Sequence, residues 1–385
     1  MSLPTRSTPT TLSTTLGTTL GAIALLGALV GCGSDDDEPA TGADSSDTSS
    51  ESSAASDSAA ISADRCDANT EAGKVTYMSG YYWQASASIL EVIAADRLGY
   101  FEDVCLDVEM QPGPGDTSQN AKLLASGQVQ ITPLSEQDII TSNANGLKLT
   151  GISSYSDAGL DILMTMPEVT DLTQLKGKTL GHKGYLPISV AAMLAKAGLA
   201  TDDVKQVKVG YDPSVLTRGQ VDALTGFVSN EPNQLKSAGE DVTVWEPKDF
   251  GVPGSLGAIA VNPEFAEDHP SAVEDFLRAT FKAYQYCAEA AHVEECIGYQ
   301  HDLAGADSDA EHETAVWTTE TQVAADTPLP GKFGSVDLDN VKALTEVVNT
   351  YMSMTVSPDD AVSWFDGSFA DAVVADDGSV IWPAP

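Results

Sequence analysis

Basic side chains are scarce in this chain, because Lys and Arg together number 19 whereas Asp and Glu number 57. The formal net charge is therefore −38. A protein that binds nucleic acid takes most of its affinity from a basic face, and an anionic lipid surface attracts the same kind of face. The composition thus argues against both partners and favours a soluble surface, including in a salty medium.

Motifs of common catalytic and nucleotide-binding sites are also missing. The chain contains no GxSxG, HExxH or GxGxxG, and no GxxxxGK followed by Ser or Thr. Its five histidines fall mostly in acidic helical or loop settings, and only His182 lies near an expected ligand loop. We therefore expect no catalytic residue, no bound metal and no cofactor. The other histidines are His269, His292, His301 and His312.

Long apolar runs are absent as well. The stretch over residues 20–30 has about 11 residues and is too short to span a bilayer. It follows a start with one basic side chain, Arg6, and so predicts a signal peptide over residues 1–31. The segment Leu29-Val-Gly-Cys32 resembles the processing box of bacterial lipoproteins. This resemblance implies that Cys32 is lipidated and holds the exported chain on the outer face of the cell membrane or in the periplasm.

Large apolar residues are almost absent from residues 32–73, where Ile61 stands among Ser, Asp, Ala, Thr and Glu. Such a segment cannot bury enough surface to offset the entropy lost on ordering, so we expect a disordered acidic tether after the lipidated Cys32. No later apolar run approaches 18 residues. The sequence therefore predicts a soluble body joined to the membrane through its lipid anchor.

Cysteine is rare, and none occurs between Cys105 and Cys287. Four cysteines follow the expected tether, and an even number in an exported chain favours two disulfides over metal ligands. None is in CxxC spacing, and no His lies within two residues of one. Three pairings are possible, of which we prefer Cys66 with Cys105 and Cys287 with Cys296.

The body alternates short β-rich runs with helical ones, which is typical of an α/β protein, and 385 residues suggest about two domains. Strands are expected at 74–78, 106–110 and 129–133. A helix is expected at about 86–98, where Ser88 and Glu91 have capping-box spacing, and a long one starts at Pro270. Two further helices, at about 309–325 and 337–354, are expected to pack on the first lobe.

Several segments together resemble the solute-binding proteins of ABC importers. They are the run 171–181 (DLTQLKGKTLG), the loop 182–185 (HKGY), the element 218–227 (RGQVDALTGF) and the run 229–232 (SNEP). The resemblance implies a two-lobed type II periplasmic-binding-protein fold, with lobe 1 over 74–163 and 251–385 and lobe 2 over 164–250. It also implies a hinge near Leu163 and Gly251 whose closure traps a ligand.

Loops at the strand ends should line the cleft between such lobes. The three consecutive rings of Tyr81, Tyr82 and Trp83 open this set, and Arg218 is the only arginine of the second lobe. Aromatic and acidic side chains suit a flat heterocycle that donates hydrogen bonds, with Trp83 as one wall of the slot. We expect the ligand-binding residues Tyr82, Trp83, Ser118, Ser135, Glu136, Tyr155, Tyr185, Tyr211, Asn230 and Glu231.

The family branch that the chain resembles includes binders of the thiamine pyrimidine precursor, of riboflavin, and of alkanesulfonate or nitrate. The ring-and-carboxylate lining favours the pyrimidine precursor, with riboflavin and then an alkanesulfonate or nitrate as alternatives. Another alternative is an enzyme of pyrimidine synthesis on the same fold, although this chain lacks that enzyme's cysteine-rich iron motif. The resemblance implies a monomer whose partners are a small-molecule ligand and the permease and ATPase subunits of an importer.

Overall fold

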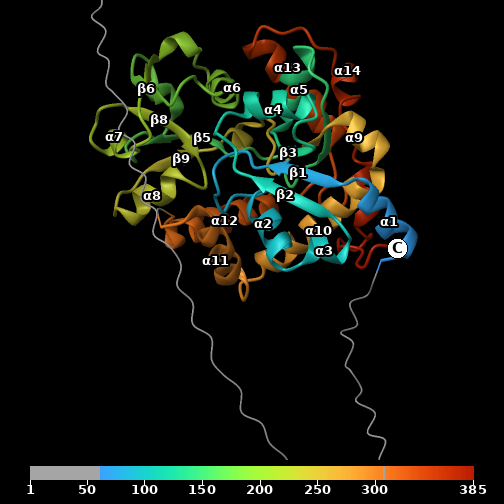
Figure 1. Cartoon of the computed structure of the whole chain (residues 1–385). Helices are drawn as coiled ribbons and strands as arrows, with labels where there is room; N and C mark the ends of the chain where they lie inside the picture. The colour runs from blue at the N-terminus through green and yellow to red at the C-terminus, as the bar shows by residue number, and fades with distance from the viewer. Residues whose placement is uncertain (1–60, 307) are drawn as a thin grey trace, which may run out of the picture. The chain divides into compact units, whose positions relative to one another are not determined.

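The computed structural model describes residues 61–306 and 308–385, which form two β-sheets flanked by helices (Figure 1). The expected signal peptide, the expected lipidation site at Cys32 and most of the expected tether lie outside these residues. Within the described part, no helix is both long and apolar enough to cross a lipid bilayer.

The first sheet has five strands in the order β2-β1-β3-β10-β4. Strand β1 pairs in parallel with β2 and β3, whereas β10 runs antiparallel to β3 and β4. The predicted strand 74–78 is confirmed, with Val75 and Tyr77 fully buried. The strands are β1 (Lys74–Met78), β2 (Asp107–Gln111), β3 (Ile131–Pro133), β4 (Thr150–Ser153) and β10 (Ile259–Val261).

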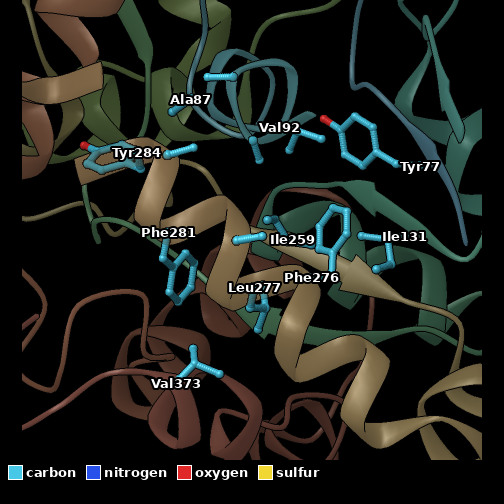
Figure 2. Close-up of a cluster of buried hydrophobic side chains, with 14 of the residues drawn as sticks. Tyr77, Ala87, Val92, Ile131, Ile259, Phe276, Leu277, Phe281, Tyr284 and Val373 are labelled. Atoms are coloured by element: carbon cyan, nitrogen blue, oxygen red, sulfur yellow. The ribbon is translucent and has the colours of Figure 1, made fainter. Parts of the chain in front are cut away.

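Helix α10 (Pro270–Ala288) supplies much of the core beside this sheet (Figure 2). It begins at Pro270 as predicted, because the first residue of a helix needs no backbone donor. Phe276 stacks on Tyr77 with ring centroids 5.9 Å apart. Burial of each large apolar side chain stabilises the fold by about 1.5–3 kcal/mol. The labelled core also includes Ile131, Ile259, Leu277, Phe281, Tyr284 and, from α15 (Ser368–Val373), Val373.

The second sheet has the order β7-β6-β8-β5-β9. Strand β6 pairs in parallel with β7 and β8, whereas β5 runs antiparallel to β8 and β9. The run 171–181 forms the 3-10 turn η1 (Leu172–Leu175) and the start of β6, as expected. The strands are β5 (Asp161–Thr165), β6 (Thr179–His182), β7 (Lys205–Lys208), β8 (Ala223–Phe227) and β9 (Thr243–Trp245).

The chain crosses between the two sheets through residues 154–160 and 246–258. The lobe boundary expected after residue 163 falls inside β5, which pairs with β8 along its whole length. Leu163, near which a hinge was expected, is fully buried and pairs with Thr225 and Trp245. The first crossing between the sheets therefore lies before Asp161, where β5 begins. Gly251 does lie within the second crossing.

The described residues begin with helix α1 (Ala63–Glu71), so the expectation of disorder up to residue 73 is corrected for residues 61–73. The guanidinium group of Arg65 donates to the carboxylate of Asp275 on α10 at 2.7 and 2.9 Å. These contacts hold a polar segment on α10, and the composition of the segment could not predict them. The two disulfides are the pairings preferred from the sequence, Cys66–Cys105 and Cys287–Cys296.

Helix α2 (Leu90–Arg97) begins later than the expected residue 86. The backbone of Ser88 has a φ of 68°, in the left-handed region that a helix cannot contain. One half of the expected capping box is present, because the Glu91 carboxylate accepts a 2.6 Å hydrogen bond from the Ser88 N–H. The preceding turn therefore delays the start of the helix.

The expected helices 309–325 and 337–354 are α12 (Ala310–Asp326) and α13 (Leu338–Tyr351). They contact both lobes rather than the first alone, since α12 packs on α8 (Glu231–Ser237) and α13 on α6 (Ile188–Lys196). The apolar side chains of Val347 and Tyr351 on α13 extend the second-lobe core. Other helices are α3 (Tyr100–Asp103), α4 (Thr117–Ala125), α5 (Glu136–Ala144), α7 (Ser214–Thr217), α9 (Pro263–Asp268), α11 (Val293–Ala304) and α14 (Pro358–Val362).

Candidate functional site

The candidate site lies where loops follow the carboxyl ends of β1, β6, β7 and β8. Parallel strands in a sheet bring these ends to one edge, where loop side chains can meet a ligand. Tyr81 follows β1, and burial raises the pKa of its hydroxyl. The negative charges of Asp138 and Asp161 raise this pKa further, as does Tyr185 when it ionises. Side chains from both lobes are therefore electrostatic neighbours at this edge.

A buried ion pair marks the second-lobe side of the site. The Nζ atom of Lys183, just after β6, contacts Oε1 of Glu231 at the start of α8. The Glu231 side chain is 1% exposed and that of Lys183 is 22% exposed. Burial lowers the pKa of Lys183. The same Nζ lies 5.5 Å from the ring centroid of Tyr211 and 5.8 Å from that of Phe227.

The backbone holds Glu231 in place. Its Oε2 accepts a 2.7 Å hydrogen bond from the Phe227 N–H, and its Oε1 accepts a 3.0 Å bond from Nδ2 of Asn230. A Cβ at Gly226 would lie 2.6 Å from Oε2 and 3.0 Å from Met164, so only glycine leaves room for this carboxylate. Glu231 is thus fixed at the end of β8 before any ligand arrives.

Both polar atoms of the Asn230 amide have hydrogen-bond partners. Its Oδ1 accepts from Nε2 of Gln234 at 2.9 Å and lies 2.9 Å from Nε2 of His312 on α12. Its Nδ2 donates to Glu231. The amide therefore orients the carboxylate and has little capacity left for a ligand.

Exposed tyrosine rings stand in the loops after β1, β6 and β7, and the ring of Tyr211 lies beside the Lys183 ammonium. Tyr185 is 76% exposed, Tyr211 is 80% exposed, and Tyr82 in the loop after β1 is 65% exposed. Tyr81 is less exposed, and its carbonyl accepts a hydrogen bond from the Gly113 N–H at 3.1 Å. Exposed rings beside a buried carboxylate give both a stacking surface and an acceptor.

The loop after β1, which carries Tyr81 and Tyr82, is held by a close approach of two backbone segments. A Cβ at Gly113 would lie 2.0 Å from the Ser79 carbonyl oxygen, so this position requires glycine. The same carbonyl accepts a 2.9 Å hydrogen bond from Nδ2 of Asn120. The end of β1 is therefore anchored on the segment that follows β2.

Other expected ligand residues have structural partners instead. Tyr155 is buried among Phe281, Tyr284 and Phe333, with ring centroids between 4.5 and 5.8 Å from its own. Glu136 is fully buried, and its Oε2 accepts a 2.9 Å bond from Nδ2 of Asn340. Burial raises the pKa of Glu136 well above its usual value, and the charge of Asp157 adds to the effect.

The two expected serines begin helices. Ser135 is the N-cap of α5, and its Oγ accepts from the Asp138 N–H at 3.0 Å. The Ser118 hydroxyl donates to the carboxylate of Asp116, the N-cap of α4, at 2.7 Å. Trp83 is half-buried, and its carbonyl accepts from Nε2 of Gln300 at 2.8 Å. No contact between the Trp83 side chain and the pair of Lys183 and Glu231 is recorded in the described part of the chain.

Sequence reasoning missed Lys183 and the residues on α12. Lys183 stands two positions before the expected Tyr185, and its charge was the available signal. Glu320 on α12 is buried, and its Oε2 accepts from the Ser86 hydroxyl at 2.8 Å and from the Ala87 N–H at 2.7 Å. Its Oε1 accepts from the Ser229 hydroxyl at 2.7 Å. No local pattern could reveal these contacts, because they span 91 to 234 residues.

A family model described as NMT1/THI5 like matches residues 86–292, which is more than half of the chain. The chain belongs to the NMT1/THI5-like family. A formylaminopyrimidine-binding protein of Halalkalibacterium halodurans is 26% identical over 215 residues, which are 54% of this chain and 64% of that protein. A Haemophilus influenzae protein provisionally named for thiamine biosynthesis is 30% identical over 212 residues, 53% of this chain and 66% of its own length. The chain thus spans less than two thirds of both relatives.

Relatives of this chain also include proteins named as enzymes. A 4-amino-5-hydroxymethyl-2-methylpyrimidine phosphate synthase of Candida albicans is 26% identical over 229 residues, 55% of this chain and 67% of the enzyme. Family membership by itself therefore does not separate binding from catalysis.

Solved structures share the fold of this family member. The periplasmic aliphatic sulphonate-binding protein of Escherichia coli aligns with a TM-score of 0.57 and 14% identity, over 73% of this chain and 87% of that one. The periplasmic nitrate-binding protein of a Synechocystis strain aligns with a TM-score of 0.54 and 12% identity. The alignment covers 77% of this chain and 86% of that protein. The expected two-lobed periplasmic-binding-protein fold is confirmed. At identities this low, the alignments show a shared fold and nothing about the ligand.

Proposed function

We propose that this chain is the extracytoplasmic solute-binding component of an ABC importer, and that its ligand is a thiamine pyrimidine precursor. The observation that carries the proposal is the preformed pair of Glu231 and Lys183 at the end of β8, with the exposed ring of Tyr211 beside Lys183. A carboxylate in this position can accept from the exocyclic amino group of an aminopyrimidine, while a ring such as Tyr211 stacks on its face. The name of the formylaminopyrimidine-binding relative supports the same ligand class.

Anionic ligands fit this site less well. Sulfonate and nitrate require unpaired positive charge or several N–H donors around their oxygens. Lys183 is the cation near the rings, and its charge is balanced by Glu231. Arg218, the only arginine of the second lobe, donates to the carboxylate of Asp212 at 2.8 Å. The charge balance therefore favours a neutral heterocycle over an alkanesulfonate or nitrate.

A pyrimidine-synthesis enzyme is the second candidate, because the Candida albicans relative is named as one. The two candidate functions differ in what happens to the bound pyrimidine. An importer component binds its ligand reversibly and without change, whereas the enzyme would turn it over. Incubation of the protein with a pyrimidine precursor and added iron, followed by mass spectrometry of the ligand, distinguishes them.

A titration tests the binding proposal. Tryptophan fluorescence of the purified chain is followed against a hydroxymethyl aminopyrimidine, its formylaminomethyl analogue, riboflavin and taurine. We expect saturable binding of a pyrimidine, and at least about tenfold weaker binding by Glu231→Gln, because the variant loses a charged acceptor. The matched control is Glu240→Gln, an exposed position just after α8. Equal affinity of Glu231→Gln and the parent protein would remove Glu231 from the site.

The expected partners and location belong to the same proposal. The sequence over residues 1–32 supports export and lipidation at Cys32, and a lipid-anchored monomer would present its ligand to a membrane permease. Riboflavin is the alternative ligand in the titration, because its ring system would use the same stacking surface and acceptor.

A further inference from the structure

The hydrogen bonds around Glu231 show which part of the ion pair a ligand can reach. Oε1 of Glu231 contacts Lys183 and accepts from Asn230, whereas Oε2 accepts from the Phe227 N–H and lies against Gly226. The Glu231 side chain is 1% exposed and that of Lys183 is 22% exposed. The Lys183 ammonium is therefore the part of the pair that a ligand can approach.

Lys183 offers the complementary groups. An ammonium group has three N–H donors, and a single acceptor, Glu231, is recorded for it within the described residues. Its other near neighbours are the ring faces of Tyr211 and Phe227. A ligand acceptor could thus bond to Nζ of Lys183 while the ligand ring lies on Tyr211. A ring nitrogen of an aminopyrimidine is such an acceptor.

The charge of the pair sets a second condition. An unpaired buried Glu231 would attract a cationic ligand, but Lys183 brings the charge of the pair to zero. A positive group on the ligand would then meet the Lys183 ammonium at short range in a poorly solvated site. Burial already lowers the pKa of Lys183, so a second cation nearby is unfavourable.

We propose that Lys183 is a specificity-determining residue that selects neutral aminopyrimidines and rejects those with a cationic substituent. The inference rests on the proposed function and deepens it, because it states which chemical form of the pyrimidine binds. It requires only the contact of Lys183 with Glu231 and the rings beside Nζ.

Two ligands of nearly equal size test this selection. 4-Amino-5-hydroxymethyl-2-methylpyrimidine is neutral, and its 5-aminomethyl analogue carries an alkylammonium group near neutral pH. Isothermal titration at about 150 mM salt, where long-range attraction to the acidic surface is screened, gives the ratio of the two dissociation constants. We expect the wild-type protein to bind the hydroxymethyl compound about tenfold or more tightly.

Three variants isolate the charge. In Lys183→Gln the ratio should fall about tenfold or more, because Glu231 then attracts the aminomethyl group. Lys183→Arg keeps the charge and should keep the preference for the neutral ligand. Lys205→Gln removes an exposed lysine at the start of β7 and should leave the ratio unchanged.

The outcomes are separable. If the wild type binds a pyrimidine but prefers the aminomethyl compound, or if folded Lys183→Gln keeps the wild-type ratio within about twofold, the role of Lys183 is refuted while the proposed function stands. If the wild type binds neither pyrimidine, the proposed function fails and the inference fails with it. If circular dichroism shows Lys183→Gln to be unfolded, the wild-type ratio and Lys183→Arg still decide the question.

Discussion

Replacement of Glu91 by Gln should stabilise the protein at alkaline pH and have little effect at acidic pH. Glu91 is fully buried in the first turn of α2, and its Oε1 accepts from the Ser88 N–H at 2.6 Å. Burial raises its pKa from 4.5 to about 7. The fold therefore favours the protonated form, and the hydroxyl of Tyr155 lies beside the same carboxyl group.

The sign and size of the effect follow from this raised pKa. The stability contributed by Glu91 is complete below the unfolded pKa of 4.5 and is lost as the pH rises through about 7. The difference between a pKa of 4.5 and one of about 7, at about 1.4 kcal/mol per pH unit, corresponds to about 3 to 4 kcal/mol at full ionisation. Gln keeps the acceptor for the Ser88 N–H and cannot ionise. Glu91→Gln should thus gain about 3 kcal/mol at pH 8 and about 1 kcal/mol or less at pH 5.

Urea unfolding at both pH values, followed by circular dichroism, measures the difference. Other buried acids such as Asp157, whose pKa burial also raises to about 7, change the stability of both proteins alike. The control Glu102→Gln alters an exposed residue on α3 and should give no pH-dependent difference. A gain for Glu91→Gln that is the same at pH 5 and pH 8 would refute the reasoning.

Two further predictions concern the ligand site and the anchor. Gly226→Ala should weaken pyrimidine binding at least about tenfold, because its Cβ would lie 2.6 Å from Oε2 of Glu231. Titration with the pyrimidine measures this loss of affinity. The control is Gly184→Ala, because a Cβ at Gly184 meets nothing within 4 Å. Cys32→Ser should abolish incorporation of labelled palmitate into the chain expressed in a bacterium, and persistent labelling would exclude lipidation at this residue.

Local patterns predicted the elements whose determinants are local. Strand β1 was predicted at its observed bounds, because its apolar residues are contiguous in the sequence. The start of α10 follows from Pro270 alone. Helix α1 could not be predicted in this way, because Arg65 is held by Asp275, 210 residues away.

The candidate site was predictable as a set of loops but not as a set of contacts. Family resemblance pointed to the loops after β6 and β8, and Tyr211 and Glu231 both lie near Lys183 there. Tyr155 was included because it also follows a strand, yet its ring is buried in the aromatic core. Whether a loop side chain faces the core or the ligand depends on its neighbours in space, which strand-end position does not determine. The partner of Glu231 was missed for the same reason.

The hydrogen-bond partners of the buried carboxylates indicate which of these groups are structural and which could serve a ligand. Both oxygens of Asp275 are occupied by Arg65, Arg278 and Asn69, so this group has no capacity for a ligand. Glu231 instead contacts one cation, Lys183, whose Nζ lies beside the exposed ring of Tyr211, so this pair adjoins a surface that a ligand can reach. Glu320 takes only neutral donors, from the Ser86–Ala87 turn near the first sheet and from Ser229 after β8 of the second. Any motion that separates these two segments must break the hydrogen bonds of Glu320 on one side, and a buried carboxylate that loses such donors is costly. Glu320 therefore opposes separation of the segment before α2 from the loop that presents Glu231.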